Sequence, residues 1–279
     1  MREPKELPMP PSLEAPTSTE MLVDRWRDGT VERVTDRVAE EVPVALTYHG
    51  VSHVVMLATP SHLEDLGAGF TLSEGIVASP SEILSVETSQ QDDGNFEVRI
   101  GIAAERFANL LRRQRNTSGR TGCGLCGAAT FEDAIRTPER VESNLSVSTA
   151  DLHEALIAIR RHQAINSETG SVHAAAWVVP GAGIRCVRED VGRHNALDKV
   201  IGALIRAKED LSRGWILITS RASYEMVQKT ALVGVPLLAA VSAPTAFAVR
   251  LAEASGLTLI GFAREHQHVI YAHPHRLKA

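Results

Sequence analysis

The residues best suited to chemistry in this chain are two cysteines, Cys123 and Cys126, which form a C-x-x-C pair. Glycine is common in mobile or tightly turning loops, and four glycines surround the pair, at Gly119, Gly122, Gly124 and Gly127. Arginines precede the pair, and helix-compatible residues follow it. Positive charge and a helix N-terminus both lower the pKa of a cysteine thiol and stabilise its thiolate. The motif therefore predicts two catalytic thiols presented to a partner.

Three other interpretations of this pair compete with the first. A zinc site needs four ligands, and the remaining cysteine, Cys186, lies far along the chain, so histidines would have to complete it. A thioredoxin-like pair is expected beside a βαβ unit, whereas no predicted strand directly precedes Cys123. A purely structural loop would expose thiols without using them, which proteins generally avoid. We therefore expect reactive thiols and no bound metal.

Length, composition and charge indicate a globular protein of one or two domains. The chain has 279 residues, of which 44% are hydrophobic, and a formal net charge of -5, which does not favour nucleic acid as a partner. Three cysteines cannot all pair, and together with the exposed loop they favour a reducing, cytoplasmic setting. Residues 230–249 carry no charge, but Pro236 and Pro244 divide them, so no membrane span is expected. The N-terminus lacks the pattern of a secretory signal.

The N-terminal half predicts a disordered tail followed by a smaller α/β domain. Residues 1–20 are rich in proline and poor in apolar side chains, as in disordered segments. Residues 21–103 are expected to contain a β-hairpin turning at His49-Gly50 and a second hairpin turning at 92–95. Between these hairpins, Ser61 and Glu64 are spaced as a capping box that opens a helix running toward Ile76. We expect these elements to form one β-α-β-β layer.

The C-terminal half predicts a second domain over residues 151–279, after a cysteine loop and linker over 104–150. Leu152, Leu156 and Ile159 recur on one face of a helix that begins near Thr149. Short apolar runs are then expected to form strands, at 177–179, 184–188, 215–219, 236–241 and 257–262. Helical patterns alternate with these strands, at 195–208, 224–232 and 246–254. The alternation predicts a mixed sheet with parallel strands and helices on both faces.

Polar clusters follow three of these strands, at residues 188–195, 219–223 and 242–245. Ligands of such sheets bind at the carboxyl ends of the strands, where helix N-termini present free N–H groups. The three clusters are therefore expected to share one binding edge. Cys186 is expected to be a buried filler, and either structural or chemical roles remain open for His173 and His194. The histidines after residue 265 are expected to lie in a solvated tail.

Six segments resemble the formate dehydrogenase accessory sulfurtransferases, the FdhD family. The resembling segments are Gly67–Ile76, Cys123–Gly127, Thr169–Ala175, Arg188–Lys199, Arg221–Lys229 and Ser242–Thr245. The resemblance runs from about residue 40 to the end of the chain. The segment Glu189-Asp190-Val191-Gly192-Arg193-His194-Asn195 is long and unlike generic loop sequence, which makes the match specific.

The resemblance implies a cytoplasmic sulfur carrier that is required for formate dehydrogenase activity. Such a protein takes persulfide sulfur from a cysteine desulfurase and passes it to the molybdenum cofactor, as Mo-bis(molybdopterin guanine dinucleotide), before the cofactor enters formate dehydrogenase. The family fold is similar to that of cytidine deaminases, a three-layer α/β domain with a smaller domain added. The family also implies a homodimer.

Site residues follow from the resemblance by position. Cys123 resembles the persulfide-bearing cysteine, and Cys126 is expected to assist it. The segment after the last expected strand resembles the cofactor-binding segment: Phe262, Ala263, Arg264, Glu265, His266 and Gln267. We expect it to bind the guanine nucleotide part of the cofactor together with Asp190, Arg193, His194 and Arg221. Arginines would take the phosphates, and an acidic side chain would accept hydrogen bonds from guanine N–H groups.

The chain departs from the family pattern at two places, and two other functions stay under consideration. Arg120-Thr121-Gly122 and Ala128 stand where the family often has serines and a lysine, and Thr219 begins a triplet that is often Ser-Gly-Arg. The leading alternative is a non-enzymatic chaperone that binds the molybdenum cofactor with incidental thiols. A zinc hydrolase of deaminase type is excluded, because its His-x-Glu and Pro-Cys-x-x-Cys motifs are missing from the strand ends.

Overall fold

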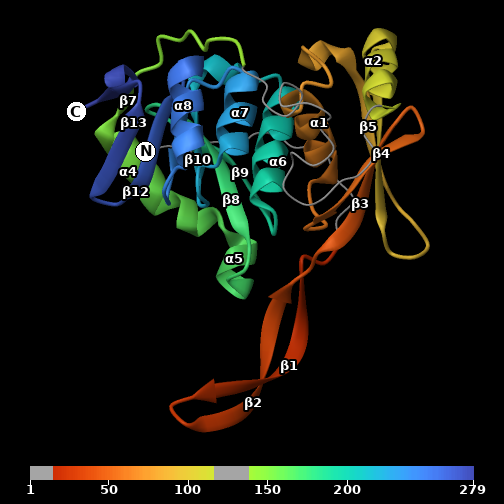
Figure 1. Cartoon of the computed structure of the whole chain (residues 1–279). Helices are drawn as coiled ribbons and strands as arrows, with labels where there is room; N and C mark the ends of the chain where they lie inside the picture. Colours follow the sequence, from red (N-terminus) through yellow and green to blue (C-terminus); the bar gives the residue numbers. More distant parts are fainter. Residues whose placement is uncertain (1–14, 116–137) are drawn as a thin grey trace.

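The computed structural model describes residues 15–115 and 138–279, and its first element is a two-stranded ribbon. Strands β1 (Ser18–Arg27) and β2 (Thr30–Ala39) pair antiparallel along their whole length. Figure 1 shows this ribbon projecting away from the rest of the molecule. The expectation that residues 18–20 belong to a disordered tail is wrong, because their backbone groups pair with β2.

A four-stranded sheet with two helices follows the ribbon. Its strands are β3 (Val42–Tyr48), β4 (Val51–Ala58), β5 (Ile83–Gln90) and β6 (Phe96–Ile102), in the order β4-β3-β6-β5. Both expected hairpins are confirmed, because β3 pairs antiparallel with β4 and β5 with β6. The first turn needs left-handed backbone at both of its residues, and His49 and Gly50 have φ angles of 49° and 81°. The central strands β3 and β6 run parallel.

Helix α1 (Leu63–Ser73) connects β4 to the short 3-10 turn η1 (Pro80–Glu82), but it lacks the expected capping box. The N-cap residue is His62 rather than Ser61, with a φ angle of 53° and no side-chain hydrogen bond to the helix start. The prediction of a capping box at Ser61 is wrong, because the helix begins after the left-handed residue His62, one position later than the Ser-x-x-Glu spacing predicts. Helix α2 (Ala104–Arg115) follows β6, so residues 104–115 are helical rather than a linker.

The second unit is built on a six-stranded mixed sheet, in the order β13-β12-β11-β10-β8-β9. Its strands are β8 (His173–Val179), β9 (Gly183–Asp190), β10 (Trp215–Ile218), β11 (Leu237–Ala240), β12 (Thr258–Arg264) and β13 (Gln267–Ala272). Strands β10, β11 and β12 are parallel, whereas β8, β9 and β13 each run antiparallel to a neighbour. This arrangement confirms the mixed α/β class. The closer likeness to cytidine deaminases stays a prediction.

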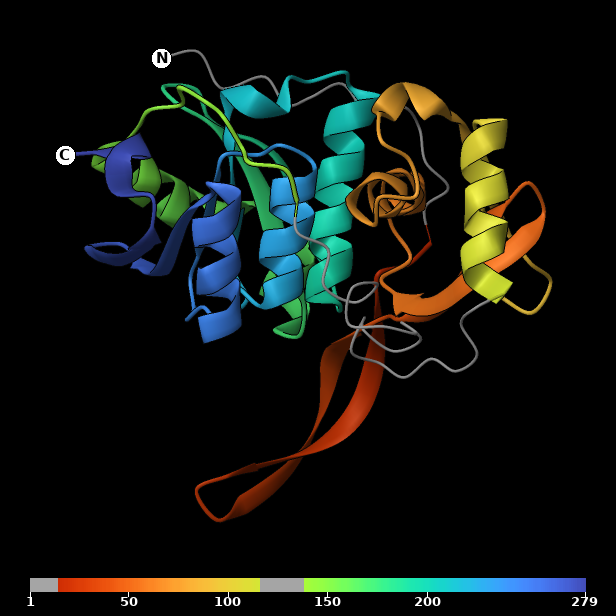
Figure 2. The ribbon, with the colours of Figure 1, turned by 45° about the horizontal axis from the view of Figure 1, so that its top comes forward.

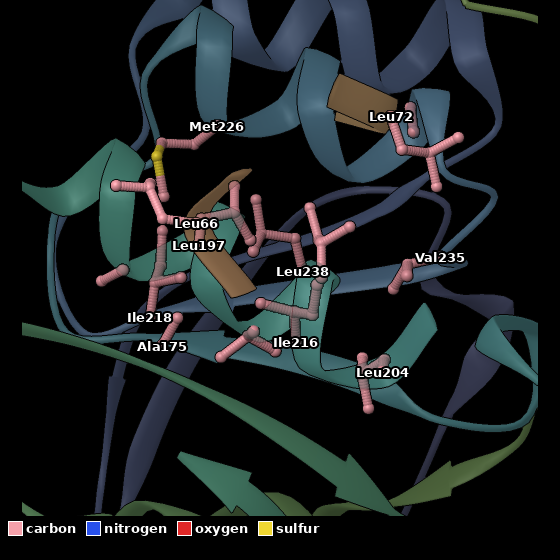
Figure 3. Close-up of a cluster of buried hydrophobic side chains, with 14 of the residues drawn as sticks. Leu66, Leu72, Ala175, Leu197, Leu204, Ile216, Ile218, Met226, Val235 and Leu238 are labelled. Atoms are coloured by element: carbon pink, nitrogen blue, oxygen red, sulfur yellow. The ribbon is translucent and has the colours of Figure 1, made fainter. Parts of the chain in front are cut away.

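Helices cover both faces of this sheet. Helix α4 (Thr149–Ala158) and the 3-10 turn η2 (Ile159–His162) pack on one face of the sheet, and α5 (Ala164–Thr169) follows them and is hydrogen-bonded to Glu189 at the end of β9. Helices α6 (Arg193–Arg206), α7 (Tyr224–Leu232) and α8 (Ala246–Ser255) lie on the other. Short strands with both faces buried are apolar throughout, and Trp215–Ile218 and Leu237–Ala240 are buried at every position. Figure 3 shows side chains of α1, α6, α7 and the sheet meeting in the larger core.

The C-terminal segment is part of the fold and not a solvated tail. Strand β13 is followed by the 3-10 turn η4 (Pro274–Arg276) and by β14 (Leu277–Lys278), which pairs with β7 (Val147–Ser148). The Arg276 guanidinium is buried and donates hydrogen bonds to the carbonyl oxygens of Gly256, at 2.7 Å, and Val141, at 3.1 Å. The expectation of a solvated tail is wrong, because this histidine-rich sequence forms the edge strand β13 and contains the buried Arg276.

The two units meet along helices α1 and α6, which lie side by side in Figure 2. The approach depends on glycine, because a Cβ atom added to Gly69 would lie 1.7 Å from the Asp198 carbonyl oxygen. A Cβ atom added to Gly202 would lie 1.8 Å from the Asp65 carbonyl oxygen. In this contact, which we call the joint, the backbones of α1 and α6 lie directly against each other. It positions the second unit directly against the first.

Buried ion pairs complete the joint between the units. The Asp65 carboxylate of α1 forms ion pairs with the guanidinium groups of Arg188 in β9, at 2.9 Å, and of Arg206 in α6. Asp198 of α6 contacts Lys229 of α7, at 2.9 Å, and Ser73 of α1, at 2.6 Å. Burial opposes the charged state, but the carboxylates of Asp198 and Glu74 raise the pKa of Lys229 above its usual value. These charges therefore stay paired inside the joint.

Candidate ligand-binding cleft

A cleft of about 850 Å³ opens at the carboxyl edge of the parallel strands β10, β11 and β12. The ends of these strands contribute Thr219, Val241 and Ala263 to its lining. Strand β8 runs the opposite way, so it contributes its beginning, at Val172 and His173. The location follows from the topology, because the carboxyl ends of parallel strands leave a crevice that the sheet itself does not fill.

The outer wall of the cleft comes from α4, η2 and α5. Leu156 and Ile159 lie on the apolar face of this region, and they both join the core and line the cleft. Helix α4 begins where Ser148 and Asp151 form a capping box, with the Asp151 N–H donating to the Ser148 hydroxyl oxygen at 3.0 Å. Arg160, Gln163 and Asn166 follow on η2 and α5 and supply polar groups. The wall is thus apolar toward the sheet and polar toward its outer end.

The segment 262–267 lies at the cleft, although not after the last strand as the sequence predicts. It forms the end of β12, a two-residue turn and the first residue of β13, with Arg264 opposite Gln267. Ala263, Arg264, Glu265, His266 and Gln267 line the cleft. The sequence misplaces the segment because the polar residues 264–267 obscure the hairpin that continues into β13.

Phe262 differs from the other members of this segment. It is absent from the cleft lining, and its side chain is 37% exposed. Its φ angle of 48° is unusual for a residue of this size. The Phe262 N–H donates to the Ser242 carbonyl oxygen at 3.2 Å, so the strained residue is held against the end of β11. This bend interrupts the register of β12 with β13 and presents Ala263 to the cleft.

Asp190 lies in the joint between the units rather than in the cleft lining. Its side chain is fully buried. The carboxylate accepts hydrogen bonds from the N–H groups of Thr59, at 3.1 Å, and Gly192, at 2.8 Å, and from the Asn195 amide at 3.0 Å. It also contacts the Lys199 ammonium at 2.6 Å. Its local role is to fasten the start of α6 to the first unit.

Arg193, His194 and Arg221 lie at the other side of the carboxyl edge, where α6 and α7 begin. His194 contacts the Glu225 carboxylate at 2.8 Å, and Arg221 is exposed just after β10. None of the three lines the cleft. Burial, and then the nearby charges of Arg193 and His194, lower the pKa of His173, which does line it. The expected single edge is therefore divided between a cleft and the starts of two helices.

Charged groups at the cleft are concentrated on η2 and on the turn between β12 and β13. Arg160 contacts Glu265 at 3.8 Å, and both side chains are largely exposed. Arg264 is also exposed and lines the cleft. Two guanidinium groups in this position suit an anionic ligand such as a diphosphate. An exposed pair such as Arg160 and Glu265 contributes little stability, so a ligand can displace it at small cost.

The sequence does not single out Arg160, Gln163 or Asn166. Arg160 lies on a four-residue 3-10 turn, Asn166 lies on a six-residue helix, and Gln163 is the residue between them, so no clear periodicity distinguishes inward from outward positions. The only available signal is the helix before them, whose apolar face predicts the buried side of Leu156 and Ile159.

Cys123 and Cys126 lie outside the described residues. Among the residues that the structure does describe, no group of three or more histidine, cysteine or acidic side chains is placed to hold a metal ion. Because both motif cysteines fall outside that part of the chain, the absence of zinc stays a prediction. Cys186 lies in β9 and is buried, as expected. No described helix is long and apolar enough to cross a membrane.

Comparison with known proteins finds relatives along nearly the whole chain. The model of the FdhD/NarQ family matches residues 39–278. A protein of Cupriavidus necator named sulfur carrier protein FdhD is 52% identical over 265 residues, covering 95% of this chain and 92% of the relative. A protein of the same name from Xanthomonas euvesicatoria is 51% identical, covering 94% of this chain and 93% of the relative.

A crystal structure assigned to a formate dehydrogenase accessory protein from Desulfotalea psychrophila has a similar fold. Its TM-score is 0.74 at 22% sequence identity, and the match covers 94% of this chain and 100% of that chain. At this identity the likeness concerns the fold alone. It extends over both units described above.

Proposed function

Since the chain belongs to the FdhD/NarQ family, we propose that it is a sulfur carrier that serves formate dehydrogenase. In this proposal the chain accepts sulfur from a cysteine desulfurase on its C-x-x-C motif. It then passes the sulfur to the molybdenum cofactor, which is cargo and not a resident group. The protein acts in the cytoplasm as a homodimer.

The observation that carries the proposal is the position of the segment 263–267. These residues line a cleft at the carboxyl edge of the sheet, which is where ligands of this class of fold bind. The same segment resembles the cofactor-binding segment of the family. The cleft offers an apolar wall for a planar ring and two exposed guanidinium groups, on Arg160 and Arg264, for phosphates. The nucleotide end of the molybdenum cofactor has these same two parts, a planar base and phosphates.

The chemistry of loading needs an accessible thiolate. The thiolate of Cys123 attacks the outer sulfur of a persulfide on the desulfurase, and a new S–S bond forms as the old one breaks. The desulfurase cysteine leaves as a thiolate, so no external oxidant or reductant takes part. Arginines near the motif favour the thiolate of Cys123 before the attack.

Cys126 has two possible uses in the release of sulfur, and both need a thiol at this spacing. It can hold the Cys123 persulfide by hydrogen bonding. It can also attack the inner sulfur, in which case an intramolecular disulfide forms and sulfide leaves toward the cargo. The second route requires a thiol reductant to restore both cysteines before the next cycle.

Mass spectrometry after incubation with a cysteine desulfurase and free cysteine tests the proposal. We expect the wild type to gain the mass of one sulfur atom and Cys123→Ala to gain none, while its stability changes by less than about 0.5 kcal/mol. Cys126→Ala should still be loaded but should mature formate dehydrogenase poorly. Cys186→Ala is the matched control, because its thiol is buried in β9 and should not take part.

Two outcomes would change the assignment. Sulfur that remains on Cys123→Ala but disappears from Cys126→Ala would identify Cys126 as the carrier. If neither variant impairs maturation of formate dehydrogenase, sulfur transfer is wrong, and a non-enzymatic chaperone for the molybdenum cofactor takes its place.

A further inference from the structure

Gln163 places a hydrogen-bonding group without a protein partner in the wall of the cleft. The residue is only 7% exposed, and it belongs to the cleft lining. Within residues 15–115 and 138–279, its carboxamide makes no hydrogen bond to another protein group. Its amide atoms are not sealed from solvent, so water in the cleft can reach them. A ligand that enters the cleft can replace this water and take up the hydrogen bonds of the carboxamide.

The backbone around Gln163 is held firmly. Its carbonyl oxygen accepts a hydrogen bond from the Ser167 N–H at 2.9 Å, within the first turn of α5. The Glu189 carboxylate of β9 accepts two more, from the N–H groups of Ile165 and Asn166, each at 2.9 Å. Glu189 is itself 7% exposed, so water competes little for these contacts. The turn that carries Gln163 is therefore fixed to the sheet before any ligand arrives.

The neighbours of Gln163 in the lining determine which kind of ligand it can meet. Leu156, Ile159 and Val172 supply apolar surface, whereas the guanidinium groups of Arg160 and Arg264 are exposed. An apolar wall with one buried carboxamide suits a planar heterocycle that carries a donor and an acceptor on one edge. The exposed arginines suit the phosphates of the same ligand.

Neither carboxylate near this wall is well placed to read such an edge. Glu189 is committed to the backbone of α5, and Glu265 is exposed and contacts Arg160. A carboxylate also accepts hydrogen bonds only, whereas a carboxamide both donates and accepts. The guanine ring presents a carbonyl oxygen next to a ring N–H, which is the pattern that a carboxamide matches with two parallel hydrogen bonds.

We propose that Gln163 is the specificity-determining residue that binds this edge of the nucleotide base. Its amide N–H donates to the ring carbonyl oxygen, and its amide oxygen accepts from the adjacent ring N–H. The inference rests on the proposed function, in which the nucleotide end of the cofactor enters this cleft. It replaces the acidic side chain that the sequence suggests for this task with a buried amide.

Calorimetry on the full chain tests this role with GDP as the probe. Gln163→Leu keeps the size of the side chain and removes both hydrogen bonds, so we expect it to weaken GDP binding about tenfold or more. Inorganic pyrophosphate, measured by its competition with GDP, lacks the base and should bind the variant and the wild type equally. Gln91→Leu is the matched control, because Gln91 is exposed in the turn between β5 and β6, and GDP should bind it as it binds the wild type.

The outcomes separate this inference from the function on which it rests. Equal GDP affinity in Gln163→Leu and the wild type overturns the role of Gln163 and leaves the proposed function standing. A parallel loss of GDP and pyrophosphate binding also overturns it, because the substitution would then have damaged the cleft in general. A wild type that binds no GDP overturns both the nucleotide assignment and this inference, whereas sulfur loading of Cys123 would still be observed.

Discussion

His62 is a residue whose protonation is expected to affect the stability of the whole chain. Burial, and then the positive charge of Arg188, lower its pKa from 6.5 to about 4. The folded state therefore binds a proton at this position less readily than the unfolded state does. The contribution of neutral His62 to the free energy of unfolding is fully present above pH 6.5. It is lost as the pH falls toward 4, and the loss amounts to about 3 kcal/mol in total.

Replacing His62 isolates its share of the acid sensitivity. His62→Asn is the suitable variant, because asparagine tolerates the left-handed backbone that this position needs. Urea denaturation between pH 7 and pH 4 should show a smaller loss of unfolding free energy in the variant than in the wild type. Carboxylates titrate in both proteins, so only the difference between the two curves reports on His62. Parallel curves would contradict the assignment.

At the scale of the elements, the contact between α1 and α6 depends on two glycines. The backbones approach so closely at Gly69 and Gly202 that no Cβ atom fits at either position. In an exposed helix, a change from glycine to alanine stabilises by about 1 kcal/mol, because it reduces the freedom of the unfolded chain. Here Gly69→Ala and Gly202→Ala should do the reverse, since each added methyl group forces the helices apart.

Thermal unfolding measures the cost of separating these helices. Overpacking of this kind costs about 1–3 kcal/mol, and the buried ion pairs of Asp65 and Asp198 would be strained as well. The double variant should lose less than the sum of the two single losses, because one displacement accommodates both methyl groups. A rise in melting temperature for either single variant would show that the joint is looser than this packing implies.

Elements with a strong local pattern could be predicted from the sequence. The apolar runs of β10 and β11 and the helix Tyr224–Leu232 lie where the pattern places them, because burial on both faces leaves an uninterrupted apolar strand. The ribbon β1–β2 and strand β13 could not be predicted in this way. The side chains of β1 and β2 are mostly exposed, and those of β13 are mostly only partly buried or exposed, so polar and charged residues occupy positions where alternation would otherwise be visible.

The residues of the candidate site likewise fall into those that could be placed from the sequence and those that could not. Residues 263–267 could be placed by resemblance to a family segment, and the structure positions them at the cleft. Gln163 and Asn166 could not, because a buried amide that precedes a six-residue helix, and one amide within that helix, leave no periodic signal. Asp190 looks like a ligand-binding carboxylate in the sequence, yet its buried partners belong to the joint between the units. The presence of a carboxylate in the sequence therefore does not distinguish a ligand-binding residue from one that fastens the two units together.

At the scale of the whole molecule, the joint makes one body of two sheets. Thr59 at the end of the first unit's strand β4 contacts both Asp190 and Lys199 of the second unit. Removing one member of such a buried pair leaves an uncompensated charge, which typically costs about 3–5 kcal/mol. We therefore expect the two units to unfold together.

The ribbon β1–β2 is the part of the molecule that this cooperative body does not need. No side chain between residues 18 and 39 belongs to either buried core, and Leu22, Trp26 and Val31 are each more than half exposed, at 62%, 69% and 65%. Deleting residues 22–27 together with residues 30–35 joins Met21 to Asp36 through the existing turn at Asp28-Gly29. The pairing of these two residues has the same alternation as that of Arg27 with Thr30, so the turn keeps its geometry.

The shortened chain should keep its stability and its cleft. The base of the ribbon is retained, including the contact of Arg37 with Glu168 of α5 at 3.1 Å. A two-stranded ribbon alone is marginally stable in water, so its outer half adds little to the free energy of unfolding. We expect urea denaturation to give a value within about 0.5 kcal/mol of the wild type, as for surface changes generally, and calorimetry to give an unchanged GDP affinity. A loss of several kcal/mol would show that the outer ribbon supports the fold, because nothing else in that segment is removed.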